Sequence, residues 1–307
     1  MQISTSLRFD RAISQMGIAQ DRLGKTQLQL TNGKEVLKPS DAPDKAATIT
    51  RLNSVIARQE SYLETVKAVE DKLSQQETAA KSASDVITRL KELTVQAAND
   101  TYSPQDRKYI DIEVRELRDQ LLSLANTQDV NGNYIFSGSR VGKVAFAADA
   151  NGRLVYQGDQ TVSPAGVGDQ REVATNRAGT NPFGRLIRVA TDGEPVPVGF
   201  FQVIEDLSSA LQANDVSGLQ RAVGEVGTLQ DSMTESLAHI GASRNVLESQ
   251  TSLAEETLLR LKGTLSDAQD VDYSEAITRM NKDMLALEAA QSSFAKISQL
   301  NLFDYIR

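Results

Sequence analysis

Residues 44–103 read DKAATITRLNSVIARQESYLETVKAVEDKLSQQETAAKSASDVITRLKELTVQAANDTYS and contain neither glycine nor proline. Apolar and small residues recur along this stretch in alternating steps of four and three, the spacing of a helix with one buried seam. The seam residues are Leu52, Ile56, Gln59, Leu63, Val66, Val69, Leu73, Gln76, Ala80, Ala83, Ile87, Leu90, Thr94 and Ala97. We expect one helix of about 55 residues, roughly 80 Å long at 1.5 Å per residue. Such a length favours an elongated helical bundle over a compact domain.

A second heptad-like series precedes the long helix. Its members are Phe9, Ile13, Met16, Gln20, Leu23, Gln27 and Leu30. Gly33 stands where this first helix would end, since glycine is the usual residue just past a helix C-terminus. The proline-bounded segment 39–43, PSDAP, then separates the two helices.

Further helices follow on the C-terminal side. Ser103, Pro104 and Asp106 form a helix start, and the apolar stripe that follows is Ile110, Val114, Leu117, Leu121 and Leu124. The short connection predicts that this helix returns antiparallel along the long one. Helical periodicity resumes near residue 200, continues from about 216 to 268, and restarts after a cap-like DYSE at 272–275. The last helix carries Ile277, Met280, Met284, Leu287, Ala290, Phe294 and Ile297 at helical spacing.

The segment 131–199 has a different composition. It holds 11 of the 19 glycines and four of the seven prolines, residues that are costly inside helices. Segments 134–136 and 153–156 are strand candidates, and DANG at 149–152 is a turn signal. We therefore expect a small β-rich insertion here.

These elements together predict a mainly α fold with a small β-rich insertion, built as an elongated antiparallel helical bundle. The two chain ends form a coiled-coil-like pair. Three regions are expected: a terminal helical assembly region (1–38 with 266–307), a central long-helix bundle (39–130 with 200–265) and an outward-facing insertion (131–199).

The composition disfavours several classes of partner and site. The formal charge of −8 and the lack of a Lys/Arg cluster argue against nucleic acid. The absence of cysteine removes disulfides and thiolate chemistry. No stretch approaches the roughly 18 consecutive apolar residues of a membrane span, and the N-terminal MQISTSLR lacks the apolar core of a secretory signal.

Catalytic and metal-binding patterns are weak. His239 is the single histidine, which disfavours histidine relays and two-histidine metal sites. Ser293 and Lys296 fit a Ser-x-x-Lys pattern without its companion motifs. Asp267, Asp270 and Asp272 lack the spacing and central glycine of a calcium loop. We expect a structural protein with no cofactor and no metal, not an enzyme.

The chain ends are apolar, although termini normally fray unless something holds them. We expect them to be loose in the monomer and to become ordered on assembly. The predicted assembly interface is Phe9, Ile13, Met16, Leu23, Leu30, Ile277, Met280, Met284, Leu287, Phe294, Ile297, Leu300, Leu302 and Phe303.

Four segments resemble the flagellin family when taken in their order. They are ITRLKELTVQAANDT at 87–101, NGNYIFSG at 131–138, PSDAP at 39–43 and ISQLNLF at 297–303. The resemblance covers roughly 1–140 and 235–307. PSDAP and FSG are more similar to the hook–filament junction members than to the flagellins themselves.

The resemblance implies a tube of terminal helices inside an outer helical layer, and an adaptor ring between the hook side and the flagellin filament. It implies as partners other copies of the chain, a neighbouring hook-associated protein, flagellin, and an export chaperone that binds the C-terminal helix. Export would follow the flagellar type III route, without a cleaved signal peptide. Three alternatives stay open: a flagellin, an elongated surface adhesin that uses the insertion, and a cytoplasmic coiled-coil regulator.

Overall fold

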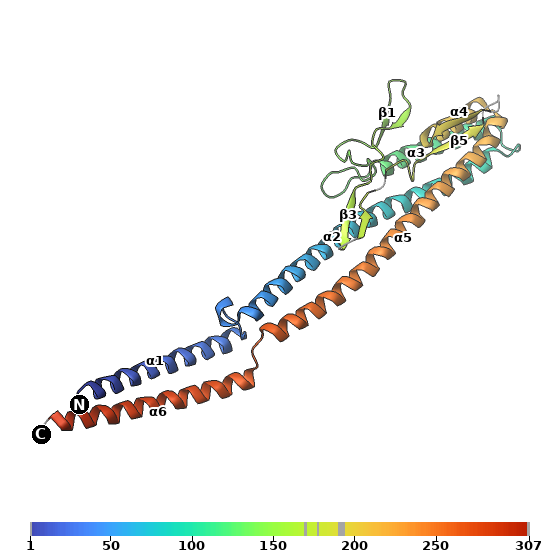
Figure 1. The fold of residues 1–307 in the computed structure, drawn as a ribbon. Helices are drawn as coiled ribbons and strands as arrows, with labels where there is room; N and C mark the ends of the chain where they lie inside the picture. The colour runs from blue at the N-terminus through green and yellow to red at the C-terminus, as the bar shows by residue number, and fades with distance from the viewer. Residues whose placement is uncertain (1, 169–170, 177, 190–193, 306–307) are drawn as a thin grey trace. The chain divides into compact units, whose positions relative to one another are not determined.

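The computed structural model describes residues 2–168, 171–176, 178–189 and 194–305. Its helices and strands follow the predicted order, α first, a β-rich middle, and α again (Figure 1). The helices are α1 (Gln2–Asn32), α2 (Pro43–Ala97), α3 (Pro104–Ala125), α4 (Phe200–Ala213), α5 (Val216–Gln269) and α6 (Tyr273–Tyr305), with a short 3-10 helix at Pro39–Asp41. The expectation of a mainly α fold with a small β insertion is confirmed.

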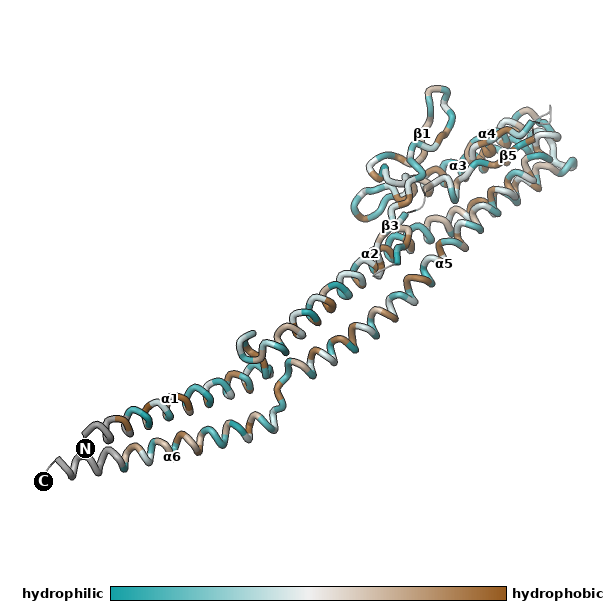
Figure 2. The backbone as a smooth tube through the Cα atoms, in the orientation of Figure 1, coloured by the Kyte–Doolittle hydropathy of each residue, from teal (hydrophilic) through white to brown (hydrophobic). Residues whose placement is uncertain are grey.

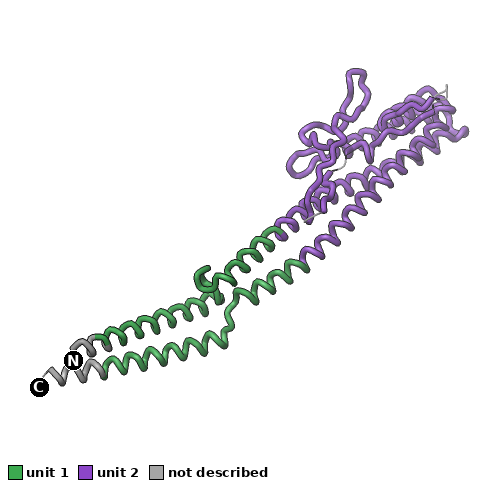
Figure 3. The backbone as a smooth tube through the Cα atoms, viewed as in Figure 1, with its two compact units in different colours: residues 1–58, 256–307 green, residues 59–255 purple. Residues whose placement is uncertain are grey.

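The chain divides into two compact units, residues 1–58 with 256–307 and residues 59–255 (Figure 3). Helices α2 and α5 contribute residues to both units. The three functional regions expected from the sequence remain a prediction, because the two units are defined by how compactly the chain packs and not by function.

Helix α2 matches the sequence expectation in length and in seam. It has 55 residues, and every predicted seam residue from Val66 to Ala97 is buried. Brown, hydrophobic segments recur along the whole of α2 in Figure 2, as a 3.5-residue repeat requires.

The start of α3 is a capping box. The Ser103 hydroxyl accepts the N–H of Asp106 at 3.2 Å, and the Asp106 carboxylate accepts the N–H of Ser103 at 3.0 Å. The buried Arg107 then donates to the carbonyl of Ala97 at 3.0 Å, and Arg89 of α2 pairs with Glu113 of α3 at 2.7 Å. These contacts hold α3 against α2, as the short connection predicts.

In the part of the chain that the structure describes, six strands form three separate antiparallel hairpins. They are β1 (Phe146–Ala148) with β2 (Leu154–Tyr156), β3 (Pro164–Gly168) with β4 (Arg171–Ala174), and β5 (Arg185–Val189) with β6 (Pro195–Gly199). The strand expected at 153–156 and the turn at 149–152 are confirmed, with Gly152 at φ +80°. The strand expected at 134–136 is wrong, because this segment is a turn that offers only one isolated bridge, at Tyr134.

That turn is fixed by packing. Phe136 is 1% exposed and lies edge-on to Phe183, with ring centroids 5.5 Å apart. Gly138 has φ +69°, and a Cβ there would lie 2.2 Å from the carbonyl oxygen of Asp159. The FSG sequence therefore forms a turn that is fixed by tertiary contacts, and not a strand.

The core of residues 59–255 joins α2–α5 to the hairpins. Five phenylalanines form a cluster: Phe136, Phe146, Phe183, Phe200 and Phe201. Neighbouring rings meet edge-to-face with centroids 5.2–5.8 Å apart, except that Phe183 and Phe201 are stacked at 6.2 Å. Gln76 of α2 donates to the carbonyl of Ile135 at 3.0 Å and ties the long helix to the insertion. Five of the eight phenylalanines of this chain thus lie where hairpins meet helices.

Candidate assembly interface

Helices α1 and α6 lie side by side and run in opposite directions within the first unit (Figure 1). On α1, residues shielded from solvent include a series in steps of four and three: Ala12, Met16, Ala19, Leu23, Thr26 and Leu30. On α6, the same spacing selects Ala276, Met280, Asp283, Leu287, Ala290 and Phe294. Both sets have the heptad pattern of a coiled-coil seam, so the coiled-coil-like pair is confirmed.

The register of this seam differs in part from the sequence expectation. Ile13, Gln20 and Gln27 of α1 are exposed, and so are Ile277 and Met284 of α6. In each case the residue one position earlier lies in the seam instead, and most of these residues are alanine. Small side chains let two helix backbones approach closely, whereas isoleucine or methionine would hold them apart.

Several of the predicted interface residues do lie in the observed seam. Met16, Leu23, Leu30, Met280, Leu287 and Phe294 are half-buried. The side chains of Phe9, Ile297, Leu300, Leu302 and Phe303 lie outside those that the structure describes. Whether any of these residues contacts a neighbouring subunit remains a prediction.

Large aliphatic side chains also lie on the solvent-facing sides of both helices. The exposed fractions are 50–56% on α1 and 43–66% on α6, for Leu7, Ile13, Ile18 and Leu28 and for Ile277, Met284 and Leu285. A helix that packs against one partner normally carries one apolar stripe. Helices that are apolar on several sides are typical of elements surrounded by further neighbours.

At the base of the helix pair, backbone hydrogen bonds join the end of α1 to the residues just before α6, and we call these contacts the clamp. Gly33 ends α1 in the left-handed region, at φ +69°, as the sequence predicts. The N–H of Val271 donates to the Gly33 carbonyl at 3.0 Å, and the N–H of Glu35 donates to the Gln269 carbonyl at 2.8 Å. Asp272 then caps α6 by accepting the N–H groups of Ser274 and Glu275, which confirms the predicted cap.

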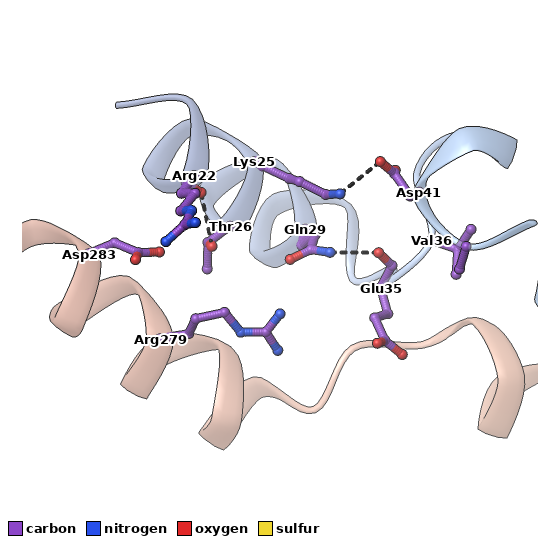
Figure 4. Close-up of a pocket in the computed structure, with 10 residues that line it drawn as sticks. Arg22, Lys25, Thr26, Gln29, Glu35, Val36, Asp41, Arg279 and Asp283 are labelled. Atoms are coloured by element: carbon purple, nitrogen blue, oxygen red, sulfur yellow. Dashed lines mark hydrogen bonds and ion pairs between the residues drawn. The ribbon is translucent and has the colours of Figure 1, made fainter. Parts of the chain in front are cut away.

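A polar cavity of about 430 Å³ lies beside this clamp (Figure 4). Gln29, buried in α1, donates to the Glu35 carbonyl at 2.6 Å, and Lys25 pairs with Asp41 at 2.7 Å. The hydrogen bond from Lys25, and then that from the Lys38 N–H, lower the pKa of Asp41.

Three cationic side chains and three carboxylates line the cavity: Arg22, Lys25 and Arg279 with Glu35, Asp41 and Asp283. The cavity lining therefore carries equal numbers of positive and negative groups. Sequence reasoning missed the buried Thr26 and Gln29 and the shielded Asp283 here. The signal for Thr26 and Asp283 was the 3.5-residue repeat itself, read in the register that begins at Ala12 and Ala276, whereas Gln29 lies outside that repeat.

The weak catalytic patterns do not converge. The His239 side chain is 57% exposed and lies 3.8 Å from Glu235 one turn earlier. Ser293 and Lys296 are both exposed on α6. Among the described residues, no group of three or more His, Asp or Glu side chains is arranged to hold a metal ion. No helix in the described part of the chain has the length and apolar character that crossing a membrane requires.

Family models for the bacterial flagellin helical regions match both flanks of the chain. The N-terminal region matches residues 3–141, and the C-terminal region matches residues 223–306. Together these matches cover well over half of the chain.

Two curated relatives match over their full length. Flagellar hook-associated protein 3 of Escherichia coli is 27% identical and covers 99% of each chain. The protein of that name in Salmonella typhimurium is 27% identical and covers 100% of each chain. A flagellin of Clostridium tyrobutyricum, 28% identical, covers 69% of this chain and 58% of its own.

Solved structures share the fold. A putative flagellar hook-associated protein from Vibrio parahaemolyticus is 20% identical, with a TM-score of 0.66 over 75% of this chain and 100% of its own. Xanthomonas campestris FlgL is 23% identical, with a TM-score of 0.61 over 71% of this chain and 99% of its own.

Proposed function

This chain belongs to the bacterial flagellin family, and on that basis we propose that it is a structural subunit of the flagellum, the adaptor ring that joins the hook side to the flagellin filament. Full-length similarity to flagellar hook-associated protein 3 supports this placement within the family. The filament proteins that match about nine-tenths of this chain are only 22–24% identical, which favours the junction over the filament. The role is structural and requires no catalysis.

The observation that carries the proposal is the pair of helices with aliphatic residues on several sides. Fully burying one such side chain contributes about 1.5–3 kcal/mol. Ordering each residue of a loose terminus costs about 1–2 kcal/mol. Burial of Leu7, Ile18, Ile277 and Leu285 by neighbouring subunits therefore offsets the ordering cost of only a few residues, and the other contacts of the two helices offset the rest.

In the proposed assembly, the terminal region (1–38 with 266–307) forms the inner tube, and the central bundle (39–130 with 200–265) forms the layer outside it. The insertion (131–199) faces outward. The subunit contacts other copies of itself, a neighbouring hook-associated protein and flagellin. The predicted interface residues, Phe9 to Leu30 and Ile277 to Phe303, lie in the tube.

The export steps are part of the same proposal. A subunit whose terminal helix pair is only marginally stable before assembly can travel unfolded through a narrow channel and fold at its destination. We expect flagellar type III export without a cleaved signal peptide. An export chaperone would cover α6 before assembly, because that helix exposes Ile277, Met284 and Leu285 when unpartnered.

Immunogold electron microscopy of intact flagella, with antibody raised against residues 131–199, tests the proposal. A single band at the hook–filament boundary is expected. Label along the whole filament would make the chain a flagellin with the same fold. Flagella without label, from an antibody that binds the free protein, would favour an adhesin or a cytoplasmic regulator.

A further inference from the structure

Three asparagine–glycine pairs occur in the chain, at residues 32–33, 131–132 and 151–152. This dipeptide is chemically labile, because glycine carries no side chain that would keep its main-chain nitrogen away from the asparagine amide. In these pairs the glycine has a positive φ, of +69°, +79° and +80° in chain order. The backbone around each pair decides how often the two groups can meet.

Two of the pairs lie in turns that repeat the same hydrogen bonds. The Asp129 carboxylate accepts the N–H groups of residues 131 and 133 at 2.8 and 2.9 Å, and the Asp149 carboxylate accepts those of 151 and 153 at the same two distances. In both turns the glycine N–H donates to the aspartate carbonyl at 3.0 Å. Since the local geometry is the same, only the surroundings of the two turns differ.

The closed form of this turn protects the asparagine. The glycine N–H is bound to the aspartate carbonyl, and the main chain of the asparagine is fixed by the aspartate side chain. The glycine nitrogen must leave its hydrogen bond before it can reach Cγ of the asparagine. The rate of a reaction between them therefore depends on how often the turn opens, which is set by local stability.

The turn at 129–133 is held from outside. Gln76 of α2, which is 2% exposed, donates to the Ile135 carbonyl at 3.0 Å. The Ile135 N–H in turn donates to the Thr127 carbonyl at 3.1 Å, on the other side of the turn. Opening this turn therefore disturbs a contact with the core of residues 59–255.

The turn at 149–153 is held only by the hairpin that it closes. Within the described part of the chain, every hydrogen bond of residues 149–153 stays inside the turn. Strands β1 and β2 have three residues each, and a two-stranded hairpin is marginally stable by itself. Asn126 holds the hairpin at Phe146, which is the end away from the turn. This exposed turn therefore opens more readily than the one at 129–133.

The third pair is held by α1 and the clamp. Asn32 is the last residue of α1, and its side-chain amide donates to the Leu28 carbonyl at 2.9 Å. The Gly33 carbonyl accepts the N–H of Val271 in the clamp. A reaction at this pair requires the helix end to unwind.

We propose that Asn151 is a site of spontaneous modification, the first of the three asparagines to lose its side-chain amide. A hydroxide ion of the solvent takes the proton of the Gly152 N–H, and the nitrogen attacks Cγ of Asn151. The new N–Cγ bond closes a succinimide ring, and the Cγ–Nδ2 bond breaks to release ammonia. Water then opens the ring, at Cγ to give aspartate or at the main-chain carbonyl of residue 151 to give isoaspartate.

Either product changes the turn. Aspartate brings a second carboxylate next to that of Asp149, and isoaspartate lengthens the main chain, so that the Asp149 carboxylate no longer fits both N–H groups that it binds. Asp149 and Arg153 line a cleft of about 780 Å³. The conversion therefore alters the charge and shape of this face of the insertion. The proposal does not depend on the place of the subunit in the flagellum.

Mass spectrometry of the full chain, incubated at mildly alkaline pH and then digested, tests the proposal. Peptide sequencing locates each conversion of amide to acid. Synthetic peptides of residues 28–37, 127–136 and 147–156 lack the fold and give the intrinsic rate of each pair. After division by the rate of its peptide, Asn151 should convert about tenfold faster than Asn131, the equivalent of one or two net hydrogen bonds.

Matched variants separate the two turns. Asp149→Ala removes the acceptor of two N–H groups and should raise the rate at Asn151 several-fold, with the rate at Asn131 unchanged. Asp129→Ala should have the reverse effect. Gln76→Leu removes the hydrogen bond from α2 and should raise the rate at Asn131 alone. Circular dichroism checks that each variant is folded.

Three outcomes would overturn the proposal. The first is that Asn131 or Asn32 converts before Asn151 in the folded chain, once each is compared with its own peptide. The second is that Asn151 stays intact while its peptide is consumed. The third is that Asp149→Ala is folded and leaves the rate at Asn151 unchanged, because the turn would then not control the reaction.

Discussion

The backbone N–H of Val271 donates to the carbonyl of Gly33, 3.0 Å away, and joins the end of α1 to the residues just before α6. The reciprocal bond runs from Glu35 to Gln269. These contacts fix the base of the terminal helix pair through main-chain atoms. Side-chain changes along α1 and α6 therefore leave this base in place, whereas a change in the backbone at Gly33 does not.

Gly33→Ala should loosen the helix pair by about 1 kcal/mol, because residues with a Cβ disfavour φ +69°. The new Cβ would also lie 3.0 Å from the Tyr273 hydroxyl. Hydrogen exchange at Val271 and Glu35 measures the effect. Gly24→Ala is the control, since nothing lies within 4 Å of its Cβ and alanine favours a helix interior. Equal exchange in both variants would contradict this role of Gly33.

Leu287→Asp and Phe294→Asp should both abolish incorporation into flagella and also loosen the isolated helix pair. Each places a carboxylate in the half-buried seam, at a cost of about 2–5 kcal/mol. The measurement is motility and flagellar labelling in a strain that lacks the native protein, with hydrogen exchange on the purified monomer. Normal incorporation of either variant would remove these residues from the interface.

Met284→Asp separates assembly from folding. Met284 is 43% exposed and lies outside the seam, so the isolated helix pair should be unchanged while incorporation is lost. Asn281→Asp, an exposed position on the same helix, adds the same charge without removing an apolar side chain and should incorporate normally. If both variants assemble alike, the outward face of α6 carries no subunit contact.

Glu225→Gln should lower the free energy of unfolding of residues 59–255 by about 1.5–3 kcal/mol, the range for a hydrogen bond to a charged group. Glu225, more than Asp206, holds the pKa of Arg188 above its ordinary value. Urea denaturation followed by circular dichroism checks this. Arg221→Gln is the control, because that side chain is half-exposed and lies 3.7 Å from the same carboxylate, where less than about 1 kcal/mol is expected.

Glu205→Gln should stabilise the protein at pH 7 by less than about 1 kcal/mol. Burial, opposed by Arg118, raises the pKa of Glu205 in the folded state. Because the pKa is raised on folding, ionised Glu205 lowers the free energy of unfolding. This loss of stability is absent below the pKa of the unfolded state and grows as pH rises through the pKa of the folded state. The urea midpoints of variant and parent should therefore differ at pH 7 and converge near pH 4. A larger difference at pH 4 would contradict the sign.

Periodicity and helix-end chemistry determined much of the fold. The predicted seam of α2 is buried from Val66 to Ala97, and the ends at Gly33, Ser103 and Asp272 are as expected. These features are local, because a 3.5-residue repeat and a cap depend on residues within one or two turns. The family resemblance likewise rested on short segments that could be read one by one.

Tertiary structure decided the rest. The sequence of each helix allows two heptad registers, one with Ile13 or Met284 in the seam and one with Ala12 or Asp283 there. How closely the two helices approach decides which register is buried. The FSG turn and the placement of the β1–β2 hairpin depend on contacts between residues far apart in the chain, such as Phe136 with Phe183 and Asn126 with Phe146. Local patterns specify which surfaces are apolar. Only packing specifies which of those surfaces meet, because burial is a property of pairs of segments.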